Sequence, residues 1–139
     1  MRKPGFGIIE HTADVGIVAW GEDLAELFSQ VAAGMYSIMV AVDDVRETES
    51  RELSVVADTL DHLLTNWLTE LLFVTETEDL VFSRFEVRIK GTQLSATAFG
   101  ERLDPLKHSI GEAVKGVTRH MFEIKRVDDG YEARVLLDV

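Results

Sequence analysis

Hydrophobic residues recur at helical spacing in the first third of the chain. They stand every three or four residues from a start near Glu22, where Glu22, Asp23 and Glu26 place negative charge in the first turn. The apolar positions are Leu24, Leu27, Phe28, Val31, Met35, Ile38 and Met39. Residues 27–42 contain no charged side chain, so we expect other elements to cover this helix on both sides.

A second amphipathic segment follows Asp58, which can cap the N-terminus of a helix. Its apolar face consists of Leu60, Leu63, Leu64, Trp67, Leu68, Leu71 and Leu72. We interpret this face as core rather than as a cofactor-binding surface, and we expect the helix to pack beside the first one. His62 precedes Asn66 by four residues on the polar face, and we interpret it as a solvated surface residue.

Seven further segments have the composition or the alternation that is typical of β-strands. They span residues 6–10, 15–20, 52–57, 80–90, 92–99, 117–127 and 131–138. The clearest, VFSRFEVRIK, alternates apolar and charged side chains and leads through a Gly-Thr turn into QLSATAF, which predicts a hairpin with one solvated face. Asp-Asp-Gly at residues 128–130 predicts a second turn, with Gly130 at positive φ.

The predicted elements define the fold class. The chain of 139 residues, 46% of them hydrophobic, is large enough to fold around one core without a disulfide or a metal. Helices that are apolar on nearly all sides, with more strands than one small sheet would hold, predict an α+β fold. We expect a single compact domain over residues 1–139, with two antiparallel helices packed against or between antiparallel or mixed β-sheets.

The composition excludes several kinds of chemistry. The chain contains no cysteine, which excludes a disulfide framework, a thiolate zinc site and a cysteine nucleophile. The N-terminal MRKPGFG lacks the apolar segment of a signal peptide, and the most apolar stretch, residues 31–42, is too short to span a membrane. We therefore expect a cytoplasmic protein that does not associate with membranes.

The acidic charge is concentrated in the first part of the chain. Residues 1–83 contain 4 Lys or Arg and 16 Asp or Glu, whereas residues 84–139 contain 10 and 9, within a net charge of −11. Such a protein repels a phosphate backbone on average, which disfavours direct RNA or DNA binding and favours a basic protein partner. The most acidic run, residues 43–52, predicts a solvated loop and edge strand, or alternatively a docking surface.

The segment HTADVGIVAWG, residues 11–21, places Asp14 at the start of a predicted strand. Taken alone, Asp14 is typical of an Asx turn, in which the side chain binds its own backbone. If the last strand runs beside this one, however, Asp138 and the carboxylate of Val139 meet Asp14 at one end of a sheet. Three carboxylates there need a cation or a proton to relieve their repulsion. Their hard oxygens favour Ca²⁺ or Mg²⁺ over zinc.

Other candidate chemical groups give only weak signals. The segment GERLDPLKH contains Glu101, Asp104 and His108, which suit general acid–base chemistry in principle. No nucleophile or oxyanion device accompanies them, so we interpret this segment as a turn and surface. Neither His108 nor His120 has the spacing of an HExxH or other metal-ligand motif. We assign no role to His11 or His120, and we expect no catalytic residue in this chain.

Several segments together resemble the archease family. They are HTADVGIVAWG, WLTELLF, ATAFGERLD, HSIGEAVKGVT followed two residues later by His120, and the final LLDV. The resemblance extends over essentially the whole chain and departs from the family pattern at Gly116 and Arg119, where Ala and Tyr are more usual. It implies a small acidic accessory protein that speeds guanylylation of the GTP-dependent tRNA-splicing ligase and restores its turnover. It also implies a calcium-type site formed by Asp14, Asp138 and a main-chain or terminal oxygen of Val139.

The leading hypothesis is therefore a metal-binding, chaperone-like activator of this RNA ligase that is not itself an enzyme. Ca²⁺ is the expected ion, with Mg²⁺ or Mn²⁺ as alternatives. Other RNA-modifying enzymes are further candidate partners. Two alternatives remain open, namely a metal-dependent hydrolase that uses Asp14, Asp138 and a histidine, and a general protein-binding chaperone. Turnover of phosphoester substrates would support the hydrolase, and binding to many unfolded clients would support the chaperone.

Overall fold

Two antiparallel β-sheets form the outer layers of the computed structural model, which describes residues 3–10 and 14–139, without the side chains of residues 10 and 119–121. The larger sheet has the strand order β1-β2-β7-β6. Its strands are β1 (Gly5–Glu10), β2 (Asp14–Gly21), β6 (Gly116–Val127) and β7 (Gly130–Asp138). The smaller sheet has the order β3-β5-β4. Its strands are β3 (Glu49–Val56), β4 (Leu80–Lys90) and β5 (Gln93–Arg102).

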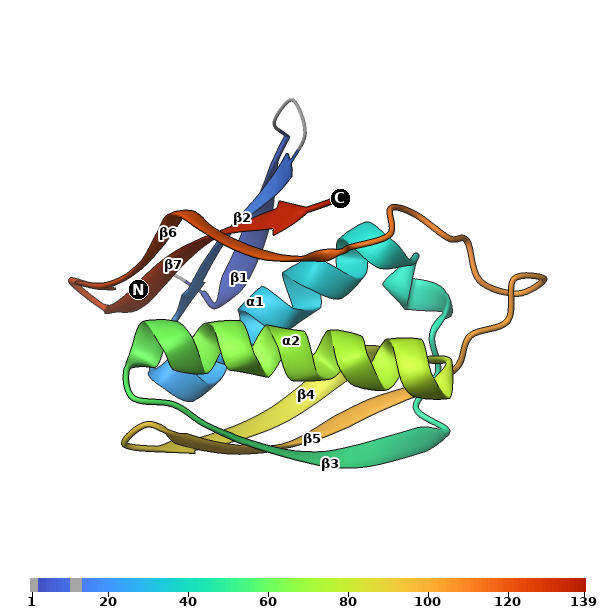
Figure 1. The fold of residues 1–139 in the computed structure, drawn as a ribbon, viewed down its shortest axis with the longest axis horizontal. Helices are drawn as coiled ribbons and strands as arrows, with labels where there is room; N and C mark the ends of the chain where they lie inside the picture. The colour runs from blue at the N-terminus through green and yellow to red at the C-terminus, as the bar shows by residue number, and fades with distance from the viewer. Residues whose placement is uncertain (1–2, 11–13) are drawn as a thin grey trace.

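Helix α1 (Leu24–Met39) lies between the two sheets (Figure 1). The Asp23 side chain caps its N-terminus by accepting a hydrogen bond from the backbone N–H of Glu26 at 2.8 Å, so the helix begins just after the expected Glu22. Its fully buried apolar side chains are Leu27, Phe28, Val31, Ala32, Met35 and Tyr36. One face packs on β2 and the other on β4, which confirms that the helix is covered on both sides.

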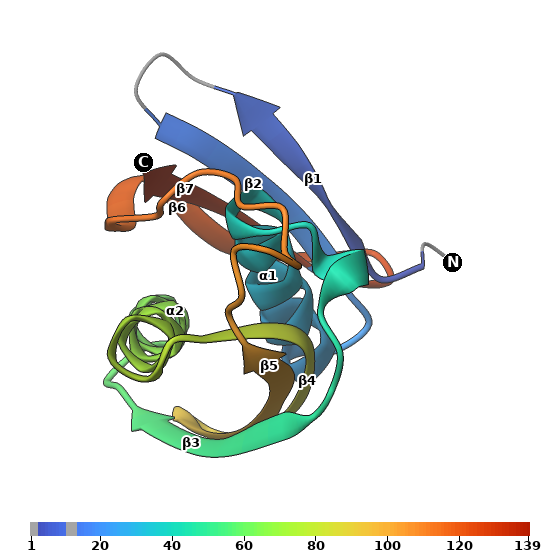
Figure 2. The same ribbon diagram turned by 90° about the vertical axis from the view of Figure 1, so that its right-hand side faces the viewer.

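Helix α2 (Leu60–Glu78) lies beside α1 and closes the space between the sheets (Figure 2). The predicted core face is confirmed, because Leu63, Leu64, Trp67, Leu68 and Leu71 are fully buried. The predicted cap at Asp58 is wrong by one residue, since the Thr59 hydroxyl accepts from the His62 backbone N–H at 3.2 Å. Asp58 instead contacts the partly exposed His62 ring, and this hydrogen bond lowers the pKa of the Asp58 carboxyl.

The two helices run in the same general direction, so the predicted antiparallel orientation is wrong (Figure 1). The Trp67 indole N–H donates to the Phe28 carbonyl at 3.1 Å, and further along both helices the Tyr36 hydroxyl donates to the Leu71 carbonyl at 3.1 Å. The cause is β3, which follows α1 and the short helix η1 (Val42–Asp44). It returns the chain to the end at which α1 began, and α2 therefore starts from that end (Figure 1).

The strands occur where the sequence pattern predicted them, with ends that differ by a few residues. In the β4–β5 hairpin Phe85 is buried and Arg84 is exposed, which confirms one solvated face. Gly130 has a φ of 155°, as predicted for the β6–β7 turn. A Cβ at Gly130 would lie 2.2 Å from the Gly21 carbonyl oxygen, so the close approach of this turn to β2 requires glycine.

Candidate metal centre

The candidate site lies where β2 begins and β7 ends. The antiparallel register places Asp14, the first residue of β2, directly opposite Asp138, the last residue of β7. This confirms the expectation that the final strand runs beside the strand that begins near Val15. Asp14, which taken alone suggested an Asx turn, therefore also has Asp138 as its partner on the neighbouring strand.

Both aspartates belong to the outer face of the four-stranded sheet. Side chains alternate along a strand, and Val135 and Leu137 of β7 are buried against the helical layer. Asp138 therefore faces away from α1, as does its register partner Asp14. Directly opposed residues in an antiparallel pair have Cβ atoms about 4.5–5.5 Å apart, a separation that lets two carboxylates bind one cation. Asp14 and Val139 are half-buried, and Asp138 is exposed.

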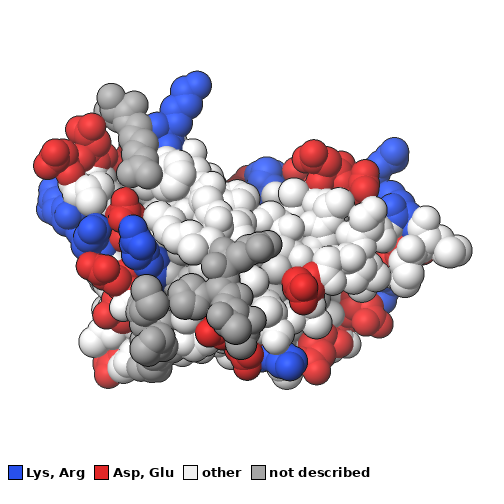
Figure 3. All heavy atoms as spheres, turned by 90° about the horizontal axis from the view of Figure 1, so that it is seen from above, with Lys and Arg blue, Asp and Glu red and all other residues white. Residues whose placement is uncertain are grey.

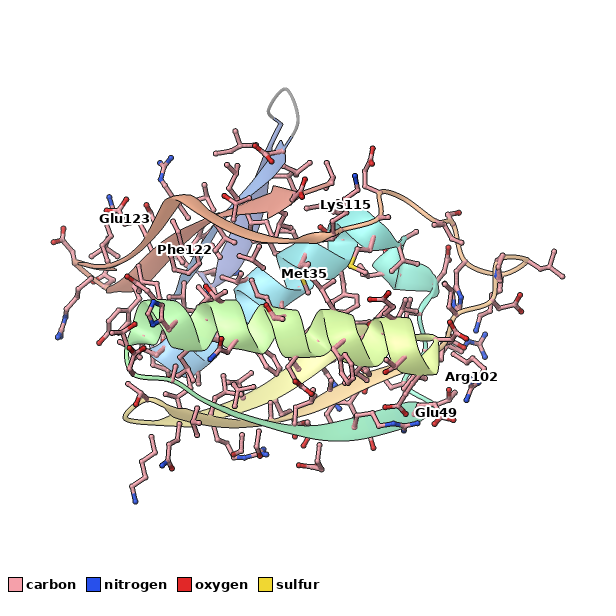
Figure 4. The ribbon with its side chains drawn as sticks, in the orientation of Figure 1. Met35, Glu49, Arg102, Lys115, Phe122 and Glu123 are labelled. Atoms are coloured by element: carbon pink, nitrogen blue, oxygen red, sulfur yellow. The ribbon has the colours of Figure 1, made fainter. Side chains whose placement is uncertain are left out.

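The start of the neighbouring strand β6, with Lys115 just before it, fixes the backbone of Asp138 and leaves space beside it. The backbone N–H of Lys115 donates to the main-chain oxygen of Asp138 at 2.7 Å. Gly116 is the register partner of Asp138, and a Cβ built there would have no neighbour within 4 Å. Figure 4 shows Lys115 close to the end of β7. The carboxylate pair is thus bordered by open space on the β6 side.

The candidate ligands at this site are the carboxylates of Asp14 and Asp138 and an oxygen of Val139. Among the described residues, no group of three or more His, Cys, Asp or Glu side chains is arranged to hold a metal ion. An oxygen of Val139, the residue after Asp138, is the third ligand that the sequence suggested. The preceding His11, Thr12 and Ala13 lie outside the described residues, and so does the side chain of His120.

The outer face of the four-stranded sheet also has a hollow with a mostly apolar lining. A shallow hollow on the same sheet is lined by Ile9, Gly16, Val18, Arg134 and Leu136, among others. Figure 3 shows Lys, Arg, Asp and Glu side chains gathered toward the two ends of this side of the molecule. No helix in the described part of the chain is long and apolar enough to cross a membrane.

The weaker acid–base candidates form a separate cluster, here called the Glu101 clasp, which consists of Arg46, Glu101, Lys107 and His108. Glu101 accepts hydrogen bonds from the backbone N–H of Arg46 at 2.6 Å and from the Lys107 ammonium at 2.7 and 2.8 Å. His108 is 3% exposed, and its Nδ1 accepts from the Asp104 backbone N–H at 2.9 Å. Its Nε2, 3.2 Å from Glu101, is then the protonated ring nitrogen and donates to that carboxylate.

The clasp is a structural device rather than a general base. The Arg46 N–H, followed by Lys107 and His108, lowers the pKa of the Glu101 carboxyl to about 2. Glu101 is therefore ionised at neutral pH, and both nitrogens of His108 are occupied. The interpretation of GERLDPLKH as a turn and surface holds for residues 103–107 only, because Gly100, Glu101 and Arg102 belong to β5 and His108 is buried. The contribution of Arg46 could not be predicted, because it lies 55 residues away in the sequence.

Nearly the whole chain is similar to a known protein family. The model of the archease protein family (MTH1598/TM1083) matches residues 6–139. Protein archease of Pyrococcus abyssi is 43% identical over 135 residues, which cover 94% of this chain and 95% of that protein. Protein archease of Methanothermobacter thermautotrophicus is 39% identical over 139 residues, which cover 97% of this chain and 99% of that protein.

Solved structures have the same architecture. The solution structure of Methanobacterium thermoautotrophicum protein 1598 superposes with a TM-score of 0.87 at 39% identity, over 97% of this chain and 99% of that one. The crystal structure of an archease from Thermotoga maritima has a TM-score of 0.66 at 21% identity, over 100% of this chain and 98% of that one, which bears on the fold alone. With the family match over residues 6–139, these similarities establish that the chain belongs to the archease family.

Proposed function

We propose that this protein is a metal-binding accessory protein that activates a GTP-dependent tRNA-splicing RNA ligase by promoting its guanylylation and multiple turnover. The observation that carries the proposal is the register of β2 and β7, which sets Asp14 against Asp138 beside Val139. Membership of the archease family supports the choice of partner. The Thermotoga maritima archease is described as a possible chaperone, which agrees with an assisting role.

The donor set of the site fits a hard divalent cation. Asp14, Asp138 and a main-chain or terminal oxygen of Val139 would hold the ion, and each of these ligands is an oxygen. Oxygen ligands favour Ca²⁺, with Mg²⁺ or Mn²⁺ as alternatives, over zinc. Open space beside Gly116 leaves room for water or for groups of a partner to complete the coordination. When bound, the ion supplies positive charge that can act on phosphate oxygens.

The role assigned to the chain itself is positioning. Guanylylation of a ligase requires nucleotide phosphates and a nucleophile to be aligned, and a protein that stabilises the aligned conformation raises the rate. Asp14 and Asp138 lie at one end of a sheet, on its outer face, where a partner can approach them. Strands β2 and β7 hold the two carboxylates in a fixed relation during that approach.

The charge of the chain supports a protein partner over a nucleic acid. A net charge of −11 gives little counterion release on binding to a phosphate backbone, so direct RNA binding is expected to be weak. The same charge steers the protein toward a basic surface, at a rate that falls as salt rises. Other RNA-modifying enzymes with basic surfaces remain further candidate partners.

The hydrolase alternative requires a histidine beside the two aspartates. Among the described residues, no histidine joins Asp14 and Asp138 in a metal-binding group. The buried His108 already donates to Glu101 and accepts from Asp104. His11 and the side chain of His120 lie outside the described residues, so the hydrolase is tested by assaying the purified protein for turnover of phosphoester substrates.

The test is guanylylation of the purified cognate ligase with GTP in the presence of substoichiometric amounts of this protein. Wild-type protein is expected to accelerate guanylylation over many turnovers, and Asp138→Ala is expected to lose this effect while remaining folded by circular dichroism. Asp129→Ala is the matched control, because Asp129 is an exposed aspartate in the β6–β7 turn, away from Asp138 along β7. Equal stimulation by folded Asp138→Ala and by wild type would contradict the proposal.

A further inference from the structure

The segment from residue 103 to residue 115 joins β5 to β6 and projects from one end of the molecule (Figure 1). Here it is called the 103–115 loop. Long connections of this kind in compact domains usually have a function of their own. Leu106 lies in this loop with 98% of its surface exposed. The other exposed large hydrophobic residues of the described chain range from 41% to 65%.

The backbone around Leu106 is fixed by local hydrogen bonds. The Asp104 carboxylate accepts from the Leu106 N–H at 3.0 Å. The Asp104 carbonyl accepts from the N–H groups of Lys107 and His108 at 3.0 and 2.7 Å. These bonds form a closed turn that holds the leucine outward.

Two tethers then attach this turn to the body of the protein. The first is the Glu101 clasp, which joins Lys107 and His108 of the loop to the end of β5 and to the backbone of Arg46. The second lies further along the loop, where the Gly111 N–H donates to the Met39 carbonyl at 2.9 Å and a β-bridge joins residue 110 to residue 40. The loop is therefore pre-organised between two fixed points.

This combination adds nothing to the stability of the isolated protein and favours binding. An exposed apolar side chain gains no burial energy from folding, and a loop that only connects two strands does not need an ionic clasp. A leucine on a rigid support, however, loses little conformational entropy when it enters a pocket of a partner. Apolar side chains that fill such pockets supply much of the binding energy of protein interfaces.

We infer that Leu106 is the anchor with which this protein docks into an apolar pocket on the ligase, an inference that rests on the proposed function. The charge near the anchor indicates the rim of that pocket. Lys107, next to Leu106, is paired with Glu101. The exposed Asp43 and Asp44 of η1 follow Ala41, whose N–H donates to the Ser109 carbonyl of the loop at 2.9 Å. Their negative charge complements a pocket with a basic rim.

The same loop also connects the anchor to the candidate metal centre. It ends at Lys115 (Figure 4), whose backbone N–H donates to the main-chain carbonyl of Asp138. The loop that carries Leu106 is therefore hydrogen-bonded at its far end to the strand end that carries Asp138. The two places have separable roles, since Leu106 supplies affinity and the aspartates supply stimulation.

The experiment measures both quantities with the purified ligase. Calorimetry gives the Kd of each variant, and a titration of guanylylation gives the concentration for half-maximal stimulation and the maximal rate. Leu106→Ser is expected to raise both the Kd and the half-maximal concentration by about ten- to hundredfold, with the same maximal rate at saturation. Leu106→Met, which keeps an apolar side chain of similar volume, is expected to retain most of the affinity.

Val56→Ser is the matched control, because Val56 is also an exposed apolar residue, 65% exposed at the end of the edge strand β3. It is expected to bind as wild type does. Asp138→Ala is expected to show the converse of Leu106→Ser, with a Kd near that of wild type and no stimulation. If Leu106→Ser binds the ligase as tightly as wild type does, Leu106 is not the anchor, and the proposed function remains intact. Wild-type protein that does not bind the ligase overturns the proposed function, and the anchor with it.

Discussion

Replacing Glu101 by Gln tests the ionic clasp that supports the 103–115 loop. The substitution keeps the size of the side chain and removes its charge. Glu101 is only 12% exposed and receives hydrogen bonds from Arg46, Lys107 and His108. The uncharged amide accepts fewer hydrogen bonds and places N–H donors against donors. The expected result is a lower free energy of unfolding.

The pKa of Glu101 gives the magnitude of this loss. A fall from the usual 4.5 to about 2 corresponds to at most about 3 kcal/mol of stability at neutral pH. Lys107 is 39% exposed, so solvent screening weakens its share of the interaction. We therefore expect Glu101→Gln to lower the free energy of unfolding by about 2 kcal/mol at pH 7.

The effect has a defined pH dependence. Because folding lowers the pKa of Glu101, its contribution is complete above the unfolded value of 4.5 and is lost as the pH falls toward about 2. The difference between wild type and Glu101→Gln should therefore shrink at pH 3 to less than half of its value at pH 7. Urea unfolding followed by circular dichroism at both pH values measures this difference.

Glu112→Gln is the control, since Glu112 is an exposed glutamate of the 103–115 loop and is not part of the clasp. We expect it to change the free energy of unfolding by less than about 0.5 kcal/mol. A destabilisation by Glu101→Gln that is the same at pH 7 and pH 3, or absent at pH 7, would refute the electrostatic role of the clasp.

Further predictions concern the packing of the core, the glycines of the sheets, RNA binding and cation binding. Trp67→Ala should lower the free energy of unfolding in urea by about 3–5 kcal/mol, because the indole is fully buried. Gly100→Ala should destabilise far more than Gly7→Ala in the same assay, since a Cβ at Gly100 would lie 1.8 Å from the Val81 carbonyl oxygen and one at Gly7 would touch nothing. No RNA gel shift is expected at micromolar protein and physiological salt. Residues added after Val139 should weaken cation binding in calorimetry if its terminal carboxylate is a ligand, and should not if the ligand is its carbonyl.

The elements of the fold could be predicted because burial imposes a period on the sequence. The uncharged residues 27–42 predicted a helix covered on both sides, and α1 does lie between two sheets. The relative direction of the helices could not be predicted in the same way. It depends on β3, whose path between α1 and α2 is set by pairing with β5, a strand that comes later in the chain.

The candidate site could be predicted for a similar reason. A strand that begins at Asp14 and a final strand that ends at Asp138 place both aspartates at one sheet end as soon as the strands pair antiparallel. The Glu101 clasp and the position of Leu106 gave no such signal. The clasp depends on a contact with the distant Arg46, and a single leucine in a polar loop has no periodicity that reveals its exposure.

The most direct test of the central claim is calorimetric titration of the purified protein with Ca²⁺. The claim is that Asp14 and Asp138 bind one cation together. Wild type and the Asp129→Ala control are expected to bind one ion per chain with the same affinity. Asp14→Ala and Asp138→Ala should each abolish binding, because one carboxylate leaves too few protein oxygens. Undiminished Ca²⁺ binding by either variant would contradict a shared site.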